Sequence, residues 1–237
     1  MKKLSLSFLA AIVMFVAATF TSCLGDSNDS RVYDFSTYMT VESNGTYAVA
    51  DNGMNLTIMN PSALQRKDGT TPSRVFAYCL VDGEFDVNNM KSAYNVKIAT
   101  EYTPSEIPTV ALSKAEDIEK CYSVSRIYDM WACNGYLNVP IIAKVDPNVK
   151  IDSWKDWNKL FQAYFERAEN DTINLRLANL TEGSYNYEDI FSFPINTLLT
   201  QLIQTHQITP KDGKISIVVS SAYKDDNVKA SCTYELN

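Results

Sequence analysis

The clearest pattern in the sequence is an alternation of apolar and polar residues close to its C-terminal end. Ile215, Ile217 and Val219 alternate with neighbours that are mostly polar, a period of two residues that is typical of a half-buried β-strand. The polar residues 224–227 then favour a turn, and the same period returns from 228 to 236. This segment predicts a β-hairpin with one face against a core and one mostly in solvent.

The N-terminal half shows shorter apolar runs that are separated by turn-forming residues. Asn44 and Gly45 predict a tight type I′ hairpin turn, which needs positive φ at both central residues. Residues 75–81 are apolar on both faces, which predicts a strand covered on both sides. The expected strands are 37–42, 47–50, 54–59, 75–81 and 94–98. Five short strands in so short a stretch predict a small barrel.

The second half predicts six or seven further strands, enough for a β-sandwich. Pro140 interrupts the first of them, which favours an edge or a bulge because proline lacks the N–H group. Apolar residues recur at helical spacing over 198–203 and predict a short amphipathic helix, and Ser113 with Glu116 predicts a capping box for another short helix ending at Lys120. The expected strands are 137–145, 160–166, 173–177, 190–195, 215–220 and 228–236.

Residues 1–22 have the layout of a bacterial secretory signal that ends before a lipid-attachment cysteine. Two lysines precede an apolar run over 6–20, which is too short to span a bilayer comfortably. A bulky residue and two small ones then precede Cys23, as in a lipobox, and 23–30 is expected to be a polar tether. The alternative is an ordinary signal peptide with a chance cysteine at its end.

The lipobox interpretation predicts a protein held at the cell envelope by acyl chains on Cys23. Two or more chains anchor a protein stably, whereas one holds it only marginally. Leu24, in place of the Asp that favours inner-membrane retention, favours the outer membrane. The periplasmic and the cell-surface side both stay open.

Composition narrows the class of partner. Without residues 1–22, which hold two lysines and no acidic residue, 19 basic and 28 acidic residues remain, so the net charge is −9. Such a chain is repelled by phosphate backbones, and no nucleic-acid partner is expected. The oxidising compartment permits disulfides, but four cysteines allow three pairings, and we expect structural roles for all four. These cysteines are Cys79, Cys121, Cys133 and Cys232.

No motif in the sequence indicates an enzyme. His206 is the only histidine, and it follows the predicted helix, where a surface position is expected. The sequence has no G-x-S-x-G elbow, no phosphate-binding glycine loop and no regular spacing of oxygen ligands for calcium. We therefore expect no catalytic residue, no metal site and no cofactor.

Three tryptophans are candidates for binding a sugar ring. Trp154 and Trp157 lie three residues apart among charged residues, and Trp131 lies in the second predicted domain. Exposed aromatic rings can stack on sugars, but aromatic residues more often fill β-sheet cores. Thr172, within Asp-Thr-Ile at a predicted turn, resembles the O-glycosylation site of exported proteins of Bacteroidota.

Several of these motifs together resemble the NigD-like lipoproteins of Bacteroidota. Besides the signal and Cys23, the likeness rests on a strand, turn and strand over 46–56, a turn before 74–78, and the Asp-Met-Trp motif that ends at Trp131 and is followed by Gly-Tyr-Leu-Asn. The late strands 173–177 and 191–193 complete it. The chain departs from the family pattern by an insertion over 146–158 and by a longer helix-bearing stretch before the last hairpin.

The resemblance implies an OB-like N-terminal barrel followed by a C-terminal β-sandwich, with one or two short helices in an all-β chain. It carries over no catalytic residue. We expect the barrel over 31–112, a connection over 113–126 and the sandwich over 127–237.

The expected function is that of a non-enzymatic outer-membrane lipoprotein that binds an unknown protein or glycan partner. The narrower alternatives are a surface glycan-binding module and a bacteriocin-associated or immunity protein, the latter suggested only by the family resemblance.

Overall fold

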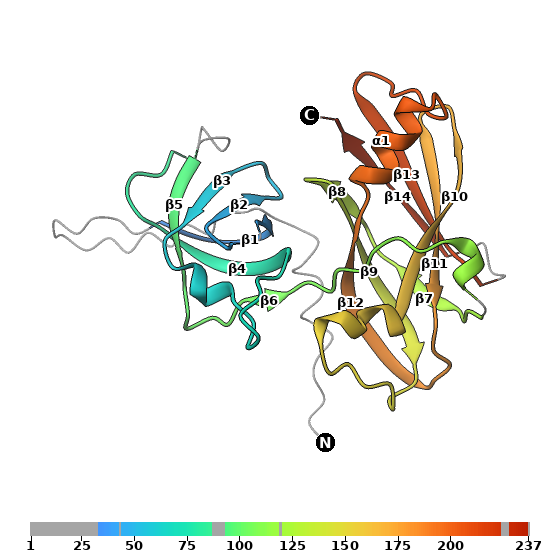
Figure 1. The fold of residues 1–237 in the computed structure, drawn as a ribbon, viewed down its shortest axis with the longest axis horizontal. Coiled ribbons are helices and arrows are strands. Elements are labelled where there is room, and N and C mark those ends of the chain that lie inside the picture. Colours follow the sequence, from blue (N-terminus) through green and yellow to red (C-terminus); the bar gives the residue numbers. More distant parts are fainter. Residues whose placement is uncertain (1–32, 43, 87–92, 119, 224–227, 237) are drawn as a thin grey trace.

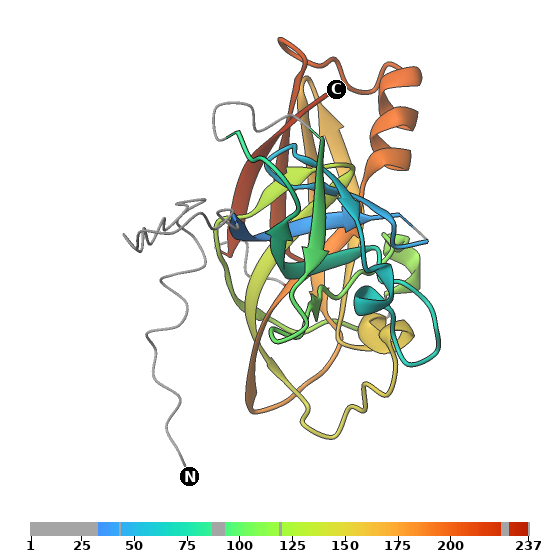
Figure 2. The same ribbon diagram turned by 90° about the vertical axis from the view of Figure 1, so that its left-hand side faces the viewer.

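The computed structural model describes residues 33–42, 44–86, 93–118, 120–223 and 228–236. The chain forms an N-terminal β-barrel and a C-terminal β-sandwich, which lie side by side along the long axis of the molecule (Figure 1). Figure 2 shows the molecule from the barrel side, with the sandwich behind it. The expected all-β class and the order of the two domains are confirmed. The predicted signal, Cys23 and the tether lie outside the described residues.

The barrel closes through β1, which pairs with β2 on one side and β4 on the other. Its strands follow the order β1-β2-β3-β5-β4 and return to β1, which gives a closed barrel of five strands. The short strand β6 pairs with β4. The core is filled by the inward residues of these strands, among them Met39, Leu56 and Val96. The strands are β1 Asp34–Val41, β2 Tyr47–Ala50, β3 Asn55–Ile58, β4 Arg74–Val81, β5 Ala93–Ile98 and β6 Ser105–Glu106.

The predicted type I′ turn at Asn44 and Gly45 is wrong in its type. Gly45 has a φ of 73°, but its N–H group donates to the carbonyl of Glu42 at 2.8 Å, so the hydrogen-bonded turn begins one residue earlier than a type I′ turn centred on Asn44 and Gly45. Instead, the N–H group of Glu42 donates to the carbonyl of Tyr47 at 2.9 Å, which closes a longer loop. Within this loop the side chain of Asn44 accepts a hydrogen bond from the N–H group of Thr46, so the hairpin forms by an Asx turn.

The expectation that β4 is covered on both sides is also wrong. One face of β4 points into the barrel core, while the other carries Arg74, Phe76, Tyr78 and Leu80 on the outside. Phe76 keeps 36% of its surface exposed. A strand of a closed barrel has only one core side, so a second apolar face needs another partner or stays in solvent.

The sandwich consists of two sheets with a shared core. One sheet has the order β10-β11-β13-β14, and the other has β12-β9-β7 with β8 also paired to β9. The core between them includes Phe161, Phe191 and Phe193, all fully buried. The strands are β7 Val124–Ile127, β8 Trp131–Cys133, β9 Tyr136–Val145, β10 Phe161–Glu169, β11 Thr172–Asn179, β12 Tyr185–Pro194, β13 Lys214–Ser221 and β14 Lys229–Glu235.

For Pro140 the expected edge is wrong, because Pro140 lies in the central strand β9. The expected irregularity is present, since β9 changes its partner from β7 to β8 here, and the carbonyl of Pro140 accepts a hydrogen bond from the N–H group of Tyr128. The capping box at Ser113 does not form, because its hydroxyl donates to Gln162 and its N–H group to the carbonyl of Ala163 on β10. Only a short 3₁₀ turn, η2 Ala115–Asp117, follows.

Short helical segments complete the fold. The predicted helix is α1 Asn196–Gln204, which packs on the sandwich beside β13 and β14. Two 3₁₀ segments, η1 Pro61–Leu64 and η3 Trp154–Lys159, lie in the connecting loops. No helix in the described part of the chain is long and apolar enough to cross a membrane.

Candidate functional site

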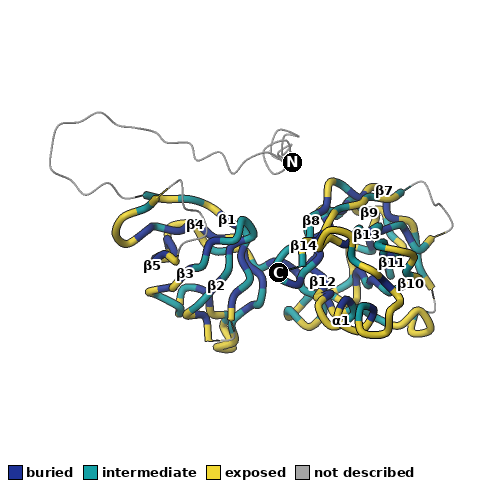
Figure 3. The backbone as a smooth tube through the Cα atoms, turned by 90° about the horizontal axis from the view of Figure 1, so that it is seen from above, coloured by how far each residue is buried: buried dark blue, intermediate teal, exposed yellow. Residues whose placement is uncertain are grey.

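The outward face of β1 and β4 is where the two domains meet, and it carries the most distinctive side chains of the molecule. Successive residue pairs across these strands point outward: Thr40 opposite Arg74, Tyr38 opposite Phe76, and Ser36 opposite Tyr78. The sandwich covers the Arg74 end, whereas Phe76 is exposed to solvent. Figure 3 shows the barrel and the sandwich side by side from above, with buried positions in both.

Arg74 is the centre of the covered end. Its side chain is fully buried, and its Nη1 and Nη2 donate to the two carboxylate oxygens of Asp51 at 2.6 and 2.7 Å. Nη1 also donates to Thr40 at 3.0 Å, and Nη2 to Oδ1 of Asn138 in β9 at 2.9 Å. A bidentate pair of this kind fixes both distance and orientation. Arg74 therefore ties the barrel directly to the sandwich.

Three further side chains complete this junction cluster. The indole N–H group of Trp131 donates to Asp51 at 2.7 Å, and the hydroxyl of Ser192 donates to Asn138 at 2.5 Å. The amide of Asn134, in the turn after β8, lies 3.3 Å from the carbonyl oxygens of both Val49 and Ala50. The hydrogen bonds thus cross the junction from several elements, which favours a defined orientation of the two domains.

The ionisation of the junction is strongly biased. Burial lowers the pKa of Arg74, but the hydrogen bonds and charge of Asp51 outweigh it, so the net pKa is raised. Burial, followed by the negative charge of Asp51, raises the pKa of Tyr38. The cluster is therefore a buried cation paired with its carboxylate.

A second contact between the domains is formed by Trp154. The guanidinium carbon of Arg66 lies 4.5 Å from the centre of the Trp154 ring, and Arg66 also donates to both carboxylate oxygens of Glu106, at 2.6 and 2.9 Å. Arg66 belongs to the barrel side and Trp154 to η3. Arginine thus bridges an aromatic ring and a carboxylate here, as Arg74 does at the junction cluster, where it lies 5.6 Å from the centre of the Tyr136 ring.

The open end of the same face carries four rings, which we call the barrel-face aromatics: Tyr38, Phe76, Tyr78 and Tyr102. Tyr38 lies 4.7 Å from Phe76 and 5.3 Å from Trp131 between ring centres. Tyr78, two residues along β4 from Phe76, lies 4.8 Å from Tyr102. Tyr102 is 59% exposed. The row begins at the domain junction and continues into solvent.

Two carboxylates lie beside the solvent end of this row. The hydroxyl of Tyr78 donates to Asp34, and this hydrogen bond is the main reason why the pKa of Tyr78 is raised to about 12. The negative charge of Glu101 adds to the effect. This end of the barrel face therefore combines exposed aromatic rings with negative charge.

The structure places the three candidate tryptophans in different surroundings. Trp131 and Trp154 are at the domain junction, and Trp157 packs edge-on against Phe191 of the sandwich core at 6.4 Å. All three are half-buried, so none stands with its ring fully free in solvent. Binding of a glycan by them stays a prediction.

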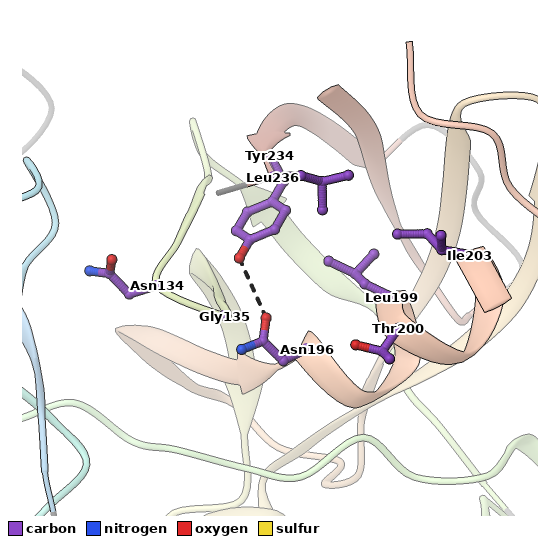
Figure 4. A pocket seen from close by; sticks show the side chains of 8 residues that line it. All are labelled: Asn134, Gly135, Asn196, Leu199, Thr200, Ile203, Tyr234 and Leu236. Atoms are coloured by element: carbon purple, nitrogen blue, oxygen red, sulfur yellow. Dashed lines mark hydrogen bonds between the residues drawn. The ribbon is translucent and has the colours of Figure 1, made fainter. Parts of the chain in front are cut away.

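A separate pocket of about 380 Å³ lies between α1, the turn after β8 and β14 (Figure 4). The hydroxyl of Tyr234 donates to Oδ1 of Asn196 across it at 3.4 Å. Gly135 has a φ of 80°, and a Cβ atom there would lie 2.3 Å from the Asn196 side chain. The lining residues are Asn134, Gly135, Asn196, Leu199, Thr200, Ile203, Tyr234 and Leu236. The lining is neutral, half polar and half apolar, and has no acid, base or nucleophilic thiol.

The four cysteines are free thiols in the structure. Burial raises the pKa of Cys79 and of Cys232 to about 12, and it also raises the pKa values of Cys121 and Cys133. The reactive thiolate is therefore suppressed at neutral pH. Within the described ranges, no three His, Cys, Asp or Glu side chains are grouped so that they could hold a metal ion.

His206 and Thr172 have simple surroundings. His206 is exposed and lies two residues beyond the end of α1, as expected. Thr172 begins β11, pairs with Glu169 and Ser216, and donates its hydroxyl to Asp171 at 3.2 Å. It is half-buried, and its glycosylation stays a prediction.

The barrel-face aromatics are the part of the site that the sequence interpretation missed. The signal was present, because residues 75–81 were apolar on both faces. The pairing of β4 with β1 places Tyr38 beside Phe76. This neighbourhood could not be inferred from the spacing of residues in the sequence.

Comparison with solved structures supports the fold. No family model matches the sequence, and no curated protein matches it either. A protein from Parabacteroides distasonis that is named as toxin-related is 17% identical, with a TM-score of 0.55 over 85% of this chain and 93% of the other. A protein from Bacteroides fragilis that is named as a lipoprotein is 12% identical, with a TM-score of 0.50 over 86% and 97%.

The structural neighbours also include a NigD-like immunity protein from Bacteroides caccae, which is 18% identical, with a TM-score of 0.46 over 89% of this chain and 100% of the other. The first two likenesses cover nearly the whole of each chain and show a shared two-domain architecture of barrel and sandwich. This is the architecture that the resemblance to NigD-like lipoproteins implied.

Proposed function

We propose that this chain is a non-enzymatic lipoprotein of the NigD-like type that binds a partner in the envelope or outside the cell. The observation that carries the proposal is the row of barrel-face aromatics, which runs out of the domain junction into solvent with Phe76 36% and Tyr102 59% exposed. Aromatic residues are enriched where proteins bind partners, because they bury a large area at a small cost in conformational entropy.

The anchor is the second part of the proposal. A lipid on Cys23 would hold the protein at the outer membrane, and the polar composition of residues 23–30 suits a tether. The name of the Bacteroides fragilis structure as a lipoprotein agrees with this location. Cys23→Ala should move the folded protein from the membrane fraction to the soluble periplasm, and retention of this variant in membranes would contradict the anchor.

Binding at the barrel face is tested by photo-crosslinking in cells. A photoreactive phenylalanine analogue replaces Tyr102 in one strain and Tyr185 in another; Tyr185 is equally exposed, at 58%, but lies on β12 of the sandwich. We expect a discrete crosslinked species from position 102 and none from position 185. Equal crosslinking from both positions, or none from position 102, would contradict the proposed surface.

The two narrower alternatives, a bacteriocin-associated or immunity role and a glycan-binding role, are tested separately. The toxin-related name of the Parabacteroides distasonis structure and the family resemblance motivate a bacteriocin-associated or immunity role. Under that version, deletion of the gene should change sensitivity to a bacteriocin, and an unchanged sensitivity argues against it. A glycan-binding role predicts hits on a glycan array that weaken in Trp154→Ala.

A further inference from the structure

We propose that the solvent end of the barrel-face aromatics binds an arginine-bearing segment of a partner protein. The site is formed by the rings of Tyr78 and Tyr102 and the carboxylates of Asp34 and Glu101. This inference rests on the proposed function and specifies the chemistry of the partner that this surface accepts.

The first argument is that, within the described ranges, the two carboxylates have no cationic partner. Asp34 is exposed and accepts the hydroxyl of Tyr78, and Glu101 is exposed next to Tyr102. Of the lysines and arginines that the structure describes, none forms a salt bridge with Asp34 or Glu101. Lys97 lies opposite Leu80 in strand register and pairs with neither carboxylate. Negative charge beside aromatic rings is thus left open to a cation from outside.

The second argument is that the molecule already fills two such places with its own arginines. Arg74 is bound by the carboxylate of Asp51 and lies 5.6 Å from the centre of the Tyr136 ring. Arg66 is bound by Glu106 and lies over Trp154. A guanidinium is planar and weakly hydrated, so it can stack on a ring and donate to a carboxylate at the same time.

The third argument is position. Arg74 and Tyr78 lie on the same outward face of β4, four residues apart, so the open site continues the interface that the sandwich already uses. The covered end of the face has an aromatic ring, a carboxylate and an arginine, whereas the open end has two rings and two carboxylates. The missing component is the arginine.

The charge of the whole chain favours the same partner. A net charge of −9 without the signal attracts basic proteins over long range and repels acidic ones. A neutral sugar could stack on Tyr102, but it would leave both carboxylates without a counter-charge. A glycan is therefore an outcome that the test must distinguish.

The test uses the detergent-solubilised lipoprotein with isotope-labelled tyrosine rings, observed by nuclear magnetic resonance. The probes are the peptide Gly-Arg-Gly-Arg-Gly, its Glu counterpart and a chitin oligosaccharide. The arginine peptide should shift the ring signals of Tyr78 and Tyr102 and leave Tyr185 unchanged. Asp34→Asn and Glu101→Gln should each weaken this binding about threefold, the effect expected for one exposed ionic or cation–π contact.

Matched controls separate local recognition from overall charge. Glu116→Gln and Asp152→Asn remove two exposed carboxylates elsewhere and should leave the affinity for the arginine peptide within error. Equal weakening by the control pair would overturn the inference, as would equal shifts with the Glu peptide or the sugar, or no shift with the arginine peptide.

The crosslinking experiment distinguishes this inference from the proposed function. If a partner is trapped from position 102 but the trapped segment has no arginine, the proposed function stands and the arginine inference fails. If nothing is trapped from position 102, the proposed function itself fails.

Discussion

The two ends of the outward face of β1 and β4 use similar residues for different purposes. At the covered end, Arg74 is fully buried, and each of its two Nη atoms donates two hydrogen bonds to neighbouring side chains. At the open end, Tyr102 and Phe76 remain exposed near Asp34 and Glu101, which form no salt bridge with a lysine or arginine of the described residues. The comparison teaches that the covered end holds the sandwich through an arginine, aromatic rings and a carboxylate together, whereas the open end presents aromatic rings and carboxylates to solvent.

Loss of the buried ion pair should have the largest effect on stability. Arg74→Ala leaves Asp51, only 14% exposed at its side chain, next to the sandwich without its counter-charge. Removing one partner of a buried pair costs about 3–5 kcal/mol. Denaturant unfolding should show this loss, and Arg66→Ala, which breaks the more exposed second contact, should cost only about 1 kcal/mol. Equal losses would show that the covered end is not the dominant link.

An intermediate effect is expected for the indole hydrogen bond at the junction. Trp131→Phe keeps a ring beside Tyr38 but removes the N–H group that donates to Asp51. A hydrogen bond to a charged group contributes about 2 kcal/mol. Thermal unfolding of this variant should report a loss near that size. A variant as stable as the parent protein would mean that water replaces the indole donor.

The pH dependence of stability should reveal a half-buried carboxyl close to the junction. Burial raises the pKa of Asp189, which accepts the hydroxyl of Tyr187. A raised pKa in the folded state means that the folded protein binds the proton more tightly than the unfolded chain does. This contribution to stability is present below the unfolded pKa of Asp189 and is lost as the pH rises through its folded pKa.

Asp189→Asn removes this dependence. The variant should be more stable than the parent protein at pH 7, and the difference should shrink as the pH falls towards the ordinary range of an aspartate. Unfolding curves of both proteins, recorded at several pH values, measure this difference in the free energy of unfolding. A constant difference at all pH values would show that Asp189 does not titrate with unfolding.

The smallest effect on stability is expected at the open end. Tyr102→Ser removes a 59% exposed ring whose aromatic contact in the structure is with Tyr78. Such a surface change should alter the free energy of unfolding by no more than about 1 kcal/mol. The same variant should weaken partner binding about threefold or more, because it removes one exposed cation–π contact. A loss of stability comparable to that of Arg74→Ala would contradict the division between the two ends.

Much of the fold could be predicted from the sequence, because it depends on local alternation. The last hairpin, helix α1 and the five barrel strands all lie within a few residues of their expected positions. Local signals also failed where a tertiary contact competed with them. Ser113 had the sequence of a helix cap, but its hydroxyl and N–H group are used by β10.

The candidate site was less predictable, since it depends on pairing between distant strands. The apolar second face of 75–81 suggested burial, and only barrel closure shows that Phe76 faces outward. Arg74 gave no sign of its role, because Asp51 and Asn138 lie 23 and 64 residues away in sequence. The tryptophans stood out in the composition, but their contacts are within the molecule.

Oxidative footprinting of aromatic side chains in intact cells and in the purified protein tests the central claim most directly. If the open end is a partner surface, Phe76 and Tyr102 should be protected in cells relative to the purified protein. The exposed Tyr185 and Tyr223 of the sandwich should be oxidised equally in both, and Trp131 should react slowly in both. If Phe76 and Tyr102 are oxidised as fast in cells as in the purified protein, the open end has no partner there and the account is contradicted.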